Sequence, residues 1–311
     1  MSEEDIEDEK MDERKELFYK SLSNAVAYVS NEAFVLLQYE IARPSVFPNL
    51  WDNIGDFDKR MNDTAEHLGG PPEAYIMSET SKVEPPPSDG YPEATLREAL
   101  EMFARARKSV IRAHMFMTGS MVLAHAPEMM NLSTETGEAE IFISRAQAAF
   151  WEHAETAYIR LYSFWDRVGQ ILEFGFFNIR KFDHNTFSAV IDRINANIVP
   201  MNKRLERSSS WKRVRSFQKS EKEDGLKWLL ARRNLIVHSL HLHPIKEKDE
   251  DVFKSQFNHL EHSHREKLRP RDAADEVVLL LGQLTQAASL FSAVLSIIEA
   301  TPSRKVDPFV R

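Results

Sequence analysis

The sequence predicts an all-α protein, and three observations support this. Apolar residues recur three and four positions apart over several long segments, which is the spacing of one helix face. The 311 residues include only 10 glycines and 14 prolines, so long stretches contain nothing that breaks a helix. Alternating apolar and polar runs, which predict strands, are short and rare. With 42% hydrophobic residues, the chain is able to bury one large core or two ordinary ones.

The N-terminal third is predicted to be an acidic tail followed by a helical region. Residues 1–16 hold nine acids and three bases, which favours a solvated and disordered tail. A Pro-rich loop is expected at 78–95, because three consecutive prolines and "SDGYP" are typical of turns. The helical region as a whole spans 17–130, with helices expected at 17–42, 50–68 and 94–124.

The remainder is predicted to form a bundle of four or five helices between residues 139 and 300. Its longest helix, 139–177, carries a wide stripe of apolar and aromatic residues. Further helices are expected at 187–199, 223–240 and 272–299. Asp272 is expected to cap the last helix. The inward positions of that helix are predicted as Val277, Val278, Leu281, Leu284, Ala288, Phe291, Leu295 and Ile298.

Charge and composition narrow the classes of function. The formal net charge is -8, of which residues 1–16 contribute -6, so the rest is almost neutral and remains compatible with an anionic partner. The chain has no cysteine, which excludes disulfides and thiolate metal sites. An acidic start is unlike a signal peptide, and no run approaches the ~20 apolar residues of a membrane span. We therefore expect a cytoplasmic protein with no membrane partner and, without a GxGxxG, P-loop or HExxH motif, no cofactor.

The segment "RRNLIVH" combines residues that suit phosphodiester chemistry. Arg233, Asn234 and His238 are the candidate catalytic residues. An arginine binds two phosphate oxygens with its forked guanidinium, and a histidine titrates near neutrality and transfers protons. Five residues turn a helix by about 140°, so Arg233 and His238 do not share one face, whereas Asn234 and His238 do. The alternative is structural, since such residues also cap the last carbonyls of a helix.

The chain resembles the HEPN superfamily of helical nucleotide-binding proteins. The resemblance covers roughly residues 139–300, and it is carried by the arginine, asparagine and histidine at R-N-x3-H and by "LYSFWDRVGQIL" in the long helix. It implies an HEPN-like bundle with an additional N-terminal helical region. It also implies a metal-independent endoribonuclease in which the 2'-hydroxyl of the RNA attacks, leaving a cyclic phosphate and a free 5'-hydroxyl.

The same resemblance implies partners. Two copies of the chain would form a homodimer in which both motifs line one composite site. Similar bacterial proteins act as toxins or abortive-infection effectors in phage defence, held inactive by an antitoxin or regulatory protein. Some HEPN proteins bind nucleotides or protein partners without cutting, and a non-catalytic binding module is therefore the alternative function.

Three residues are predicted to support the site. Asp166, in an apolar stretch of the long helix, is expected to pair with a buried base such as Arg233; an exposed surface acid is the alternative. Arg232 is expected to contact a second phosphate, or else to be a solvated neighbour. His241 is expected to lie near the RNA.

Two histidine triplets raise the question of a metal site. They have the spacing H-x2-H-x-H, and no acid has a matching spacing, so no metal is expected. We interpret the histidines of the first triplet as phosphate contacts. The triplets are His238, His241 and His243, and His259, His262 and His264.

A basic segment before the motif is the candidate RNA-binding surface. Its bases surround Trp211 and Phe217, and bases interleaved with aromatic rings suit single-stranded RNA. The alternative is a solvated helix face with its aromatic residues in the core. The candidate RNA-binding residues are Lys203, Arg204, Arg207, Lys212, Arg213 and Arg215.

Overall fold

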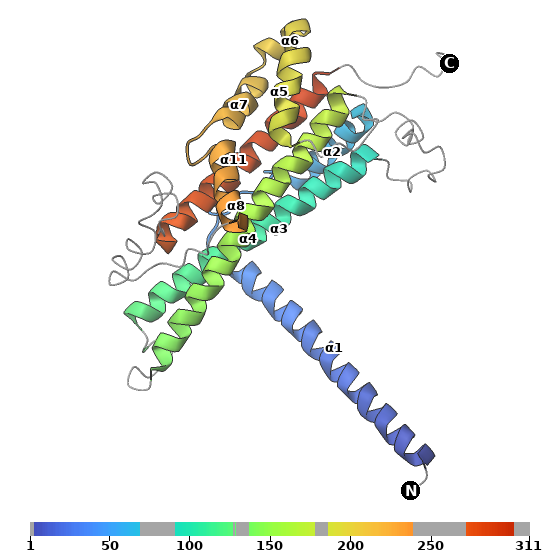
Figure 1. Ribbon diagram of the computed structural model, residues 1–311, viewed down its shortest axis with the longest axis vertical. Helices are drawn as coiled ribbons and strands as arrows, with labels where there is room; N and C mark the ends of the chain where they lie inside the picture. Colours follow the sequence, from blue (N-terminus) through green and yellow to red (C-terminus); the bar gives the residue numbers. More distant parts are fainter. Residues whose placement is uncertain are drawn as a thin grey trace. The chain divides into compact units, whose positions relative to one another are not determined.

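The computed structural model describes residues 3–68, 91–126, 128, 137–177, 186–238 and 272–301. Within these ranges the chain is all-α: it contains helices and no strand, as the sequence predicts (Figure 1). The chain divides into two compact units, Met1–Val46 and Phe47–Arg311.

The first unit consists mainly of one helix, α1, which spans Glu3–Ile41. It begins within the segment that the sequence analysis assigns to a disordered tail. No glycine or proline interrupts the chain before Pro44, and acidic residues at a helix N-terminus are favoured by the helix dipole. The helix ends just before Ser45, whose φ of 70° is incompatible with its continuation.

The second unit is built around two long helices, α3 (Tyr91–His125) and α4 (Glu138–Phe176), which lie side by side in Figure 1. The other helices pack around this pair, with α11 and α7 in mutual contact. They are α2 (Ile54–Leu68), α5 (Phe187–Asn197), the 3-10 turn η3 (Val199–Met201), α6 (Lys203–Arg207), α7 (Ser209–Lys219), α8 (Leu226–His238) and α11 (Ala273–Glu299).

Adjacent aromatic residues of α4 form the centre of the core. The Phe164 ring lies 5.6 Å from Phe103 of α3 and 5.8 Å from Phe291 of α11, centroid to centroid. The Trp165 ring lies 4.5 Å from Phe217 of α7. Four helices therefore meet at one pair of side chains, and the apolar stripe predicted for residues 139–177 is the core face of α4.

The predicted helices agree with the structure to within a few residues, apart from α1 and the basic segment. Residues 78–90 of the expected Pro-rich loop lie outside the described ranges, and 91–95 already belong to α3. The basic segment forms two helices, α6 and α7. Asn202 accepts a hydrogen bond from the Leu205 amide at 3.0 Å and Ser208 accepts one from the Trp211 amide at 3.3 Å, so each short helix has an N-terminal cap.

Helix α11 is the central helix of the C-terminal part. Asp272 caps it, as expected, by accepting a hydrogen bond from the Ala274 amide at 2.8 Å. The prediction for Val278 is wrong: this side chain is 68% exposed, and Glu276 is fully buried on the core side instead. Among the described helices, α11 alone is long and apolar enough to cross a membrane, and it supplies buried core residues such as Leu280 and Phe291.

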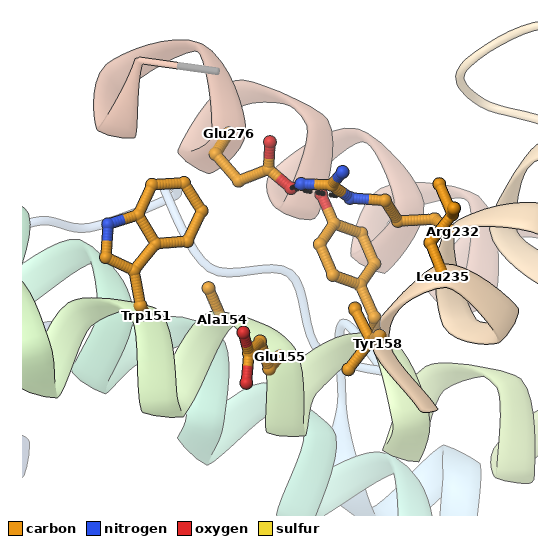
Figure 2. Close-up of a pocket in the computed structure, with 8 residues that line it drawn as sticks. Trp151, Ala154, Glu155, Tyr158, Arg232, Leu235 and Glu276 are labelled. Atoms are coloured by element: carbon orange, nitrogen blue, oxygen red, sulfur yellow. Dashed lines mark hydrogen bonds and ion pairs between the residues drawn. The ribbon is translucent and has the colours of Figure 1, made fainter. Parts of the chain in front are cut away.

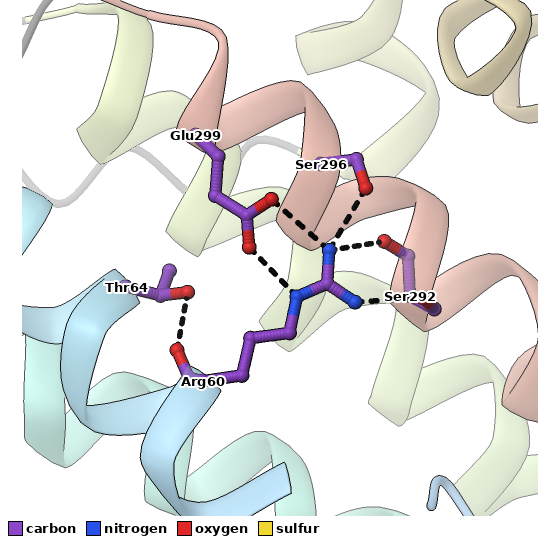
Figure 3. Close-up of polar contacts among 5 residues, drawn as sticks. All are labelled: Arg60, Thr64, Ser292, Ser296 and Glu299. Carbon is purple, nitrogen blue, oxygen red and sulfur yellow. Dashed lines mark hydrogen bonds and ion pairs between the residues drawn. The ribbon is translucent and has the colours of Figure 1, made fainter. Parts of the chain in front are cut away.

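Arg60 of α2 fastens the C-terminal end of α11, as Figure 3 shows. Its guanidinium forms an ion pair with Glu299, with Nε 2.7 Å from Oε1, and donates to the Ser292 and Ser296 hydroxyls at 2.8 Å. It also donates to the Ser292 carbonyl at 3.2 Å. One side chain thus satisfies several polar groups over two turns of α11, which fixes α2 against the core.

Removing this side chain is expected to destabilise the fold. Arg60→Ala should lower the free energy of unfolding by about 1–2 kcal/mol, because several charge-assisted hydrogen bonds are lost from a partly exposed site. Urea unfolding followed by circular dichroism measures the change. Lys203→Ala, which removes an exposed pair with Glu206, is the control and should cost less than about 0.5 kcal/mol. Equal effects of the two substitutions would contradict the role given to Arg60.

Candidate functional site

The N-terminus of α8 is fixed by Gly225 and Gln283. A Cβ atom at Gly225 would lie 2.3 Å from the Ser220 carbonyl oxygen, so only glycine fits there. The buried Gln283 amide of α11 donates to the carbonyls of Glu223 at 2.7 Å and Gly225 at 3.2 Å. The start of the motif helix is therefore held by hydrogen bonds to the core helix.

The inner face of α8 carries Arg232, which is buried (Figure 2). Its guanidinium donates to Glu276 Oε1 from Nη2 at 2.6 Å and from Nε at 3.1 Å, and it lies 5.7 Å from the Tyr158 ring centroid. A buried, paired guanidinium is unavailable to a phosphate. The expectation that Arg232 contacts a second phosphate is therefore wrong, and its charge balances Glu276 instead.

The three candidate catalytic residues lie on the sides of α8 away from Glu276: Arg233 is turned towards α4, and Asn234 and His238 share another side. Asn234 and His238 are exposed, and Arg233 is half-buried. The Arg233 Nη1 donates to Asn234 Oδ1 at 3.0 Å, and its guanidinium lies 5.7 Å from the Tyr162 ring centroid. Arg232 and Arg233 precede His238 with five and four intervening residues, and only Arg233 is followed by asparagine. Burial also distinguishes them, because Arg232 is buried and Arg233 is half-buried.

Asp166 lies one turn beyond Tyr162 on α4 and faces the same environment. Its Oδ1 accepts a hydrogen bond from the Phe187 amide at 3.4 Å. Burial raises the pKa of the Asp166 carboxyl, while the Phe187 hydrogen bond and the charges of Arg167 and Arg233 oppose the rise. Burial also raises the pKa of the Tyr162 hydroxyl; Asp166 adds to this rise and Arg233 opposes it.

The expected pairing of Asp166 with Arg233 is thus electrostatic and not a close ion pair. Within the described residues, no carboxylate lies within 4.0 Å of the Arg233 guanidinium. The neighbouring Arg167 is held by Glu98, with Nε 2.7 Å from Oε1. Among the described residues, Arg233 therefore has a carboxylate near it but no close carboxylate partner.

A small pocket beside Arg232 is a weaker candidate for a ligand-binding site than the exposed residues of α8. The buried polar atoms there that lack a hydrogen-bond partner within the described ranges include Glu276 Oε2 and Trp151 Nε1. Figure 2 shows the indole nitrogen of Trp151 pointing away from the Glu276 carboxylate. The two atoms do not converge on one ligand, so we interpret the pocket as packing space behind α8. It is lined by Trp151, Ala154, Glu155, Tyr158, Arg232, Leu235, Ile236 and Glu276.

The candidate RNA-binding residues separate into two groups. Arg215 is mostly buried, pairs with Asp192 and donates to Gln218 at 2.8 Å, so it acts within the fold. Trp211 and Phe217 are core residues, so the structural alternative holds for these aromatic rings. The other bases are exposed on α6 and α7: Lys203, Arg204, Arg207, Lys212 and Arg213.

An open groove lies between α7, the following turn and α11. Arg213, Lys219 and Lys222 bring positive charge to it, and Ser216 and Ser220 bring hydroxyls. Asp224 adds one acid, and Arg213 donates to Ser289 at 2.5 Å. The groove adjoins the N-terminus of α8, about 18 Å along that helix from His238.

The remaining histidine candidates cannot be placed. His241, His243, His259, His262 and His264 all lie outside the described residues. In the part of the chain that the structure does describe, no group of three or more histidines and acids is arranged to hold a metal ion.

Two residues of the site were missed by the sequence analysis. Glu276 lies four positions before the buried Leu280, and this spacing is the signal that would have placed it on the core face of α11. Tyr162 lies four positions before Asp166 and, at 9% exposure, resembles any core aromatic residue of α4. Its proximity to Arg233 depends on the crossing of α4 and α8, which no local pattern encodes.

The Arg232–Glu276 pair yields a stability prediction. Arg232→Met should cost about 3–5 kcal/mol in the free energy of unfolding, because Glu276 is left buried without its counter-charge. Arg232→Met combined with Glu276→Leu should recover most of this loss. Urea unfolding of the three proteins measures it. A single variant as stable as the wild type would contradict the structural role of Arg232.

Substitution of Asp166 is expected to stabilise the fold, unlike substitution of Arg232. Because burial raises its folded-state pKa, the ionised carboxylate costs stability above that pKa, and the cost disappears as the pH falls towards the unfolded-state pKa. Asp166→Asn should therefore raise the urea midpoint at pH 7.5, and the difference from the wild type should shrink on acidification. A lower urea midpoint for the variant at pH 7.5 would contradict this. It would mean that the attraction of Arg167 and Arg233 for the Asp166 carboxylate exceeds the cost of burying its charge.

Comparisons with protein-family models, with curated proteins and with solved structures find no match to this chain. The site is defined by Arg233, Asn234 and His238 of α8, with Tyr162 and Asp166 of α4 close to Arg233.

Proposed function

We propose that this chain is a metal-independent endoribonuclease of the HEPN type that acts as a homodimer. The observation that carries the proposal is the difference between the two arginines of α8. Arg232 is committed to Glu276 inside the bundle, while Arg233 is half-buried beside Tyr162, and Asn234 and His238 are exposed. An arginine and a histidine at an exposed helix end are the groups that metal-free RNA cleavage requires.

In the proposed reaction, the RNA supplies its own nucleophile. The 2'-oxygen attacks the adjacent phosphorus as its proton passes to the imidazole of His238, and the bond from phosphorus to the 5'-oxygen breaks. The leaving 5'-oxygen takes a proton from the protonated His238 of the second copy. The products are a 2',3'-cyclic phosphate and a 5'-hydroxyl, so atoms and protons balance without a metal or a protein nucleophile.

Arg233 stabilises the negative charge that accumulates on the phosphate in this reaction. Asn234 holds its guanidinium by the 3.0 Å hydrogen bond, and the face of the Tyr162 ring supports the same group. Asp166 contributes a negative potential that orients Arg233 without neutralising it by a close ion pair. We assign Asn234, Tyr162 and Asp166 as positioning residues for Arg233.

The exposed bases of α6 and α7 supply the path for the RNA backbone. Arg213, Lys219 and Lys222 line a groove at the start of α8, about 18 Å from His238 at its end. A single strand of a few nucleotides spans this distance. Contacts of this kind bind phosphates without reading bases, so sequence preference would have to come from the surroundings of the motif.

The proposed setting is the cytoplasm of a bacterial cell, where such a nuclease would act in phage defence or as the toxin of a toxin–antitoxin pair. An uncontrolled ribonuclease is harmful to its own cell, so this setting requires an antitoxin or a regulatory protein. The absence of cysteine suits a reducing compartment.

Cleavage assays of single-site variants test the proposal. Purified wild-type protein should cut a mixed RNA pool in EDTA, and Arg233→Ala and His238→Ala should each lower the rate at least about 100-fold. Lys227→Ala, on the same helix but beside Glu221, is the control and should cut like the wild type. Circular dichroism should show that all four proteins retain their helices.

Other outcomes are equally informative. Equal cutting by the wild type and both variants would contradict the assigned site. If EDTA abolished the cutting, a metal mechanism would replace the one proposed. If none of the proteins cut RNA while the wild type bound nucleotides, the chain would be the non-catalytic binding module.

A further inference from the structure

More than half of the large hydrophobic side chains that are exposed among the described residues lie on α1. Eleven large hydrophobic side chains between Leu17 and Ile41 are about half to two-thirds exposed. Isolated exposed apolar residues are ordinary, but a continuous set along one helix marks an interaction surface. They are Leu17, Phe18, Tyr19, Leu22, Val26, Tyr28, Val29, Phe34, Val35, Leu37 and Ile41.

The spacing within this surface is that of a helix pair. One row alternates steps of three and four residues, the 3.5-residue period of a coiled coil. Its members are Tyr19, Leu22, Val26, Val29, Ala33 and Leu36, of which Leu36 alone is buried in the chain. The opposite side of α1 is polar and carries Lys20, Asn24, Asn31 and Gln38. Leu17, Tyr28 and Val35 lie beside these polar residues, so the continuous apolar half of α1 is the one that contains the row.

We infer that α1 pairs with α1 of a second copy of this chain, in antiparallel orientation. A second copy provides a row of the same length and spacing, and a two-fold axis across the helix pair closes the assembly. Eight of the eleven, all except Leu17, Tyr28 and Val35, lie on the half of α1 that contains the row, and side chains exposed to this extent represent roughly 600–900 Å² of apolar surface. This is close to the ~800 Å² that each partner contributes to a standard interface.

Charge decides the orientation. Residues 1–16 carry nine acids and three bases, a net charge of -6. A parallel pair would hold two such segments about 8–10 Å apart, within one Debye length at physiological salt. An antiparallel pair places them at opposite ends of the apolar row, more than about 30 Å apart, where salt screens their repulsion.

The antiparallel arrangement also has a preferred register. One alignment puts the exposed members at the centre of the row opposite one another, with Leu22 opposite Ala33 and Val26 opposite Val29. Tyr19 then lies at the end of the pair, where Leu36 of the second copy is already buried in its own chain.

Sedimentation equilibrium of the full chain tests the pairing. The wild type should have the mass of a dimer at micromolar concentration, and Leu22→Lys/Val29→Lys should weaken dimerisation at least 100-fold. The matched control is Asn24→Lys/Asn31→Lys, which adds the same charges at the same spacing on the polar side and should remain a dimer. All these positions are exposed, so each variant should retain the wild-type helix content.

Two results would overturn the inference. One is a wild-type monomer at all concentrations, which would mean that something other than a second copy covers α1. The other is an unchanged dimer in Leu22→Lys/Val29→Lys, which would place the interface elsewhere. Because the proposed function also requires a dimer, a monomeric wild type would contradict both proposals, whereas an unchanged dimer in Leu22→Lys/Val29→Lys would overturn only the pairing through α1.

Cysteine cross-linking tests the orientation, because the chain has no cysteine of its own. Mixed samples of Leu22→Cys and Ala33→Cys proteins should form a disulfide between residue 22 of one copy and residue 33 of the other. Disulfides between two copies of the Leu22→Cys protein should be rare, since those positions lie about 16 Å apart along an antiparallel pair. Predominant pairing of identical positions would show a parallel dimer and overturn the orientation.

Discussion

The placement of α8 depends on the buried ion pair between Arg232 and Glu276. Glu276 is fully buried and Arg232 nearly so, and neither charge would tolerate this environment without the other. The pair joins α8 to the first turns of α11, while Gln283 holds the start of α8 through two carbonyls. The helix is thus held at its start by Gln283 and on one side by Arg232. Arg233, Asn234 and His238 lie on the other sides of α8 and are half-buried or exposed.

The same geometry gives the two adjacent arginines different chemistry. Arg232 donates to a carboxylate in a dry environment, so its charge is already satisfied. One position further along, Arg233 donates to a neutral amide and lies over an aromatic ring, so its charge is not cancelled by a close partner among the described residues. A helix turns by about 100° per residue, and this rotation separates a structural arginine from a candidate catalytic one.

The sequence predicted the helical class and most element boundaries well, because apolar periodicity and helix breakers are local signals. The Asp272 cap and the core stripe of α4 follow from such signals. Buried polar residues were the weak point: the position of Glu276 was missed, and Val278 was assigned to the core in error. Patterns of apolar residues carry no information about which charge a distant helix will neutralise.

The candidate site was likewise only partly predictable from the sequence. The motif on α8 was visible in the sequence, whereas the place of Tyr162 in the site depends on the crossing of α4 and α8. Arg215 was indistinguishable from its basic neighbours, because its partner Asp192 is 23 residues away in the chain. The sequence alone does not distinguish an exposed basic residue from one that is buried and paired, because the distinction depends on contacts made in the fold.

The most direct test of the central claim is the chemistry of the product ends. Mass spectrometry of a defined RNA oligonucleotide, incubated with the wild-type protein in EDTA, identifies both ends of each cut. We predict 2',3'-cyclic phosphate and 5'-hydroxyl termini, and no cut at a position where the 2'-hydroxyl is replaced by hydrogen. Products with a 5'-phosphate, or cutting at the deoxy position, would contradict attack by the 2'-hydroxyl and the roles assigned to Arg233 and His238.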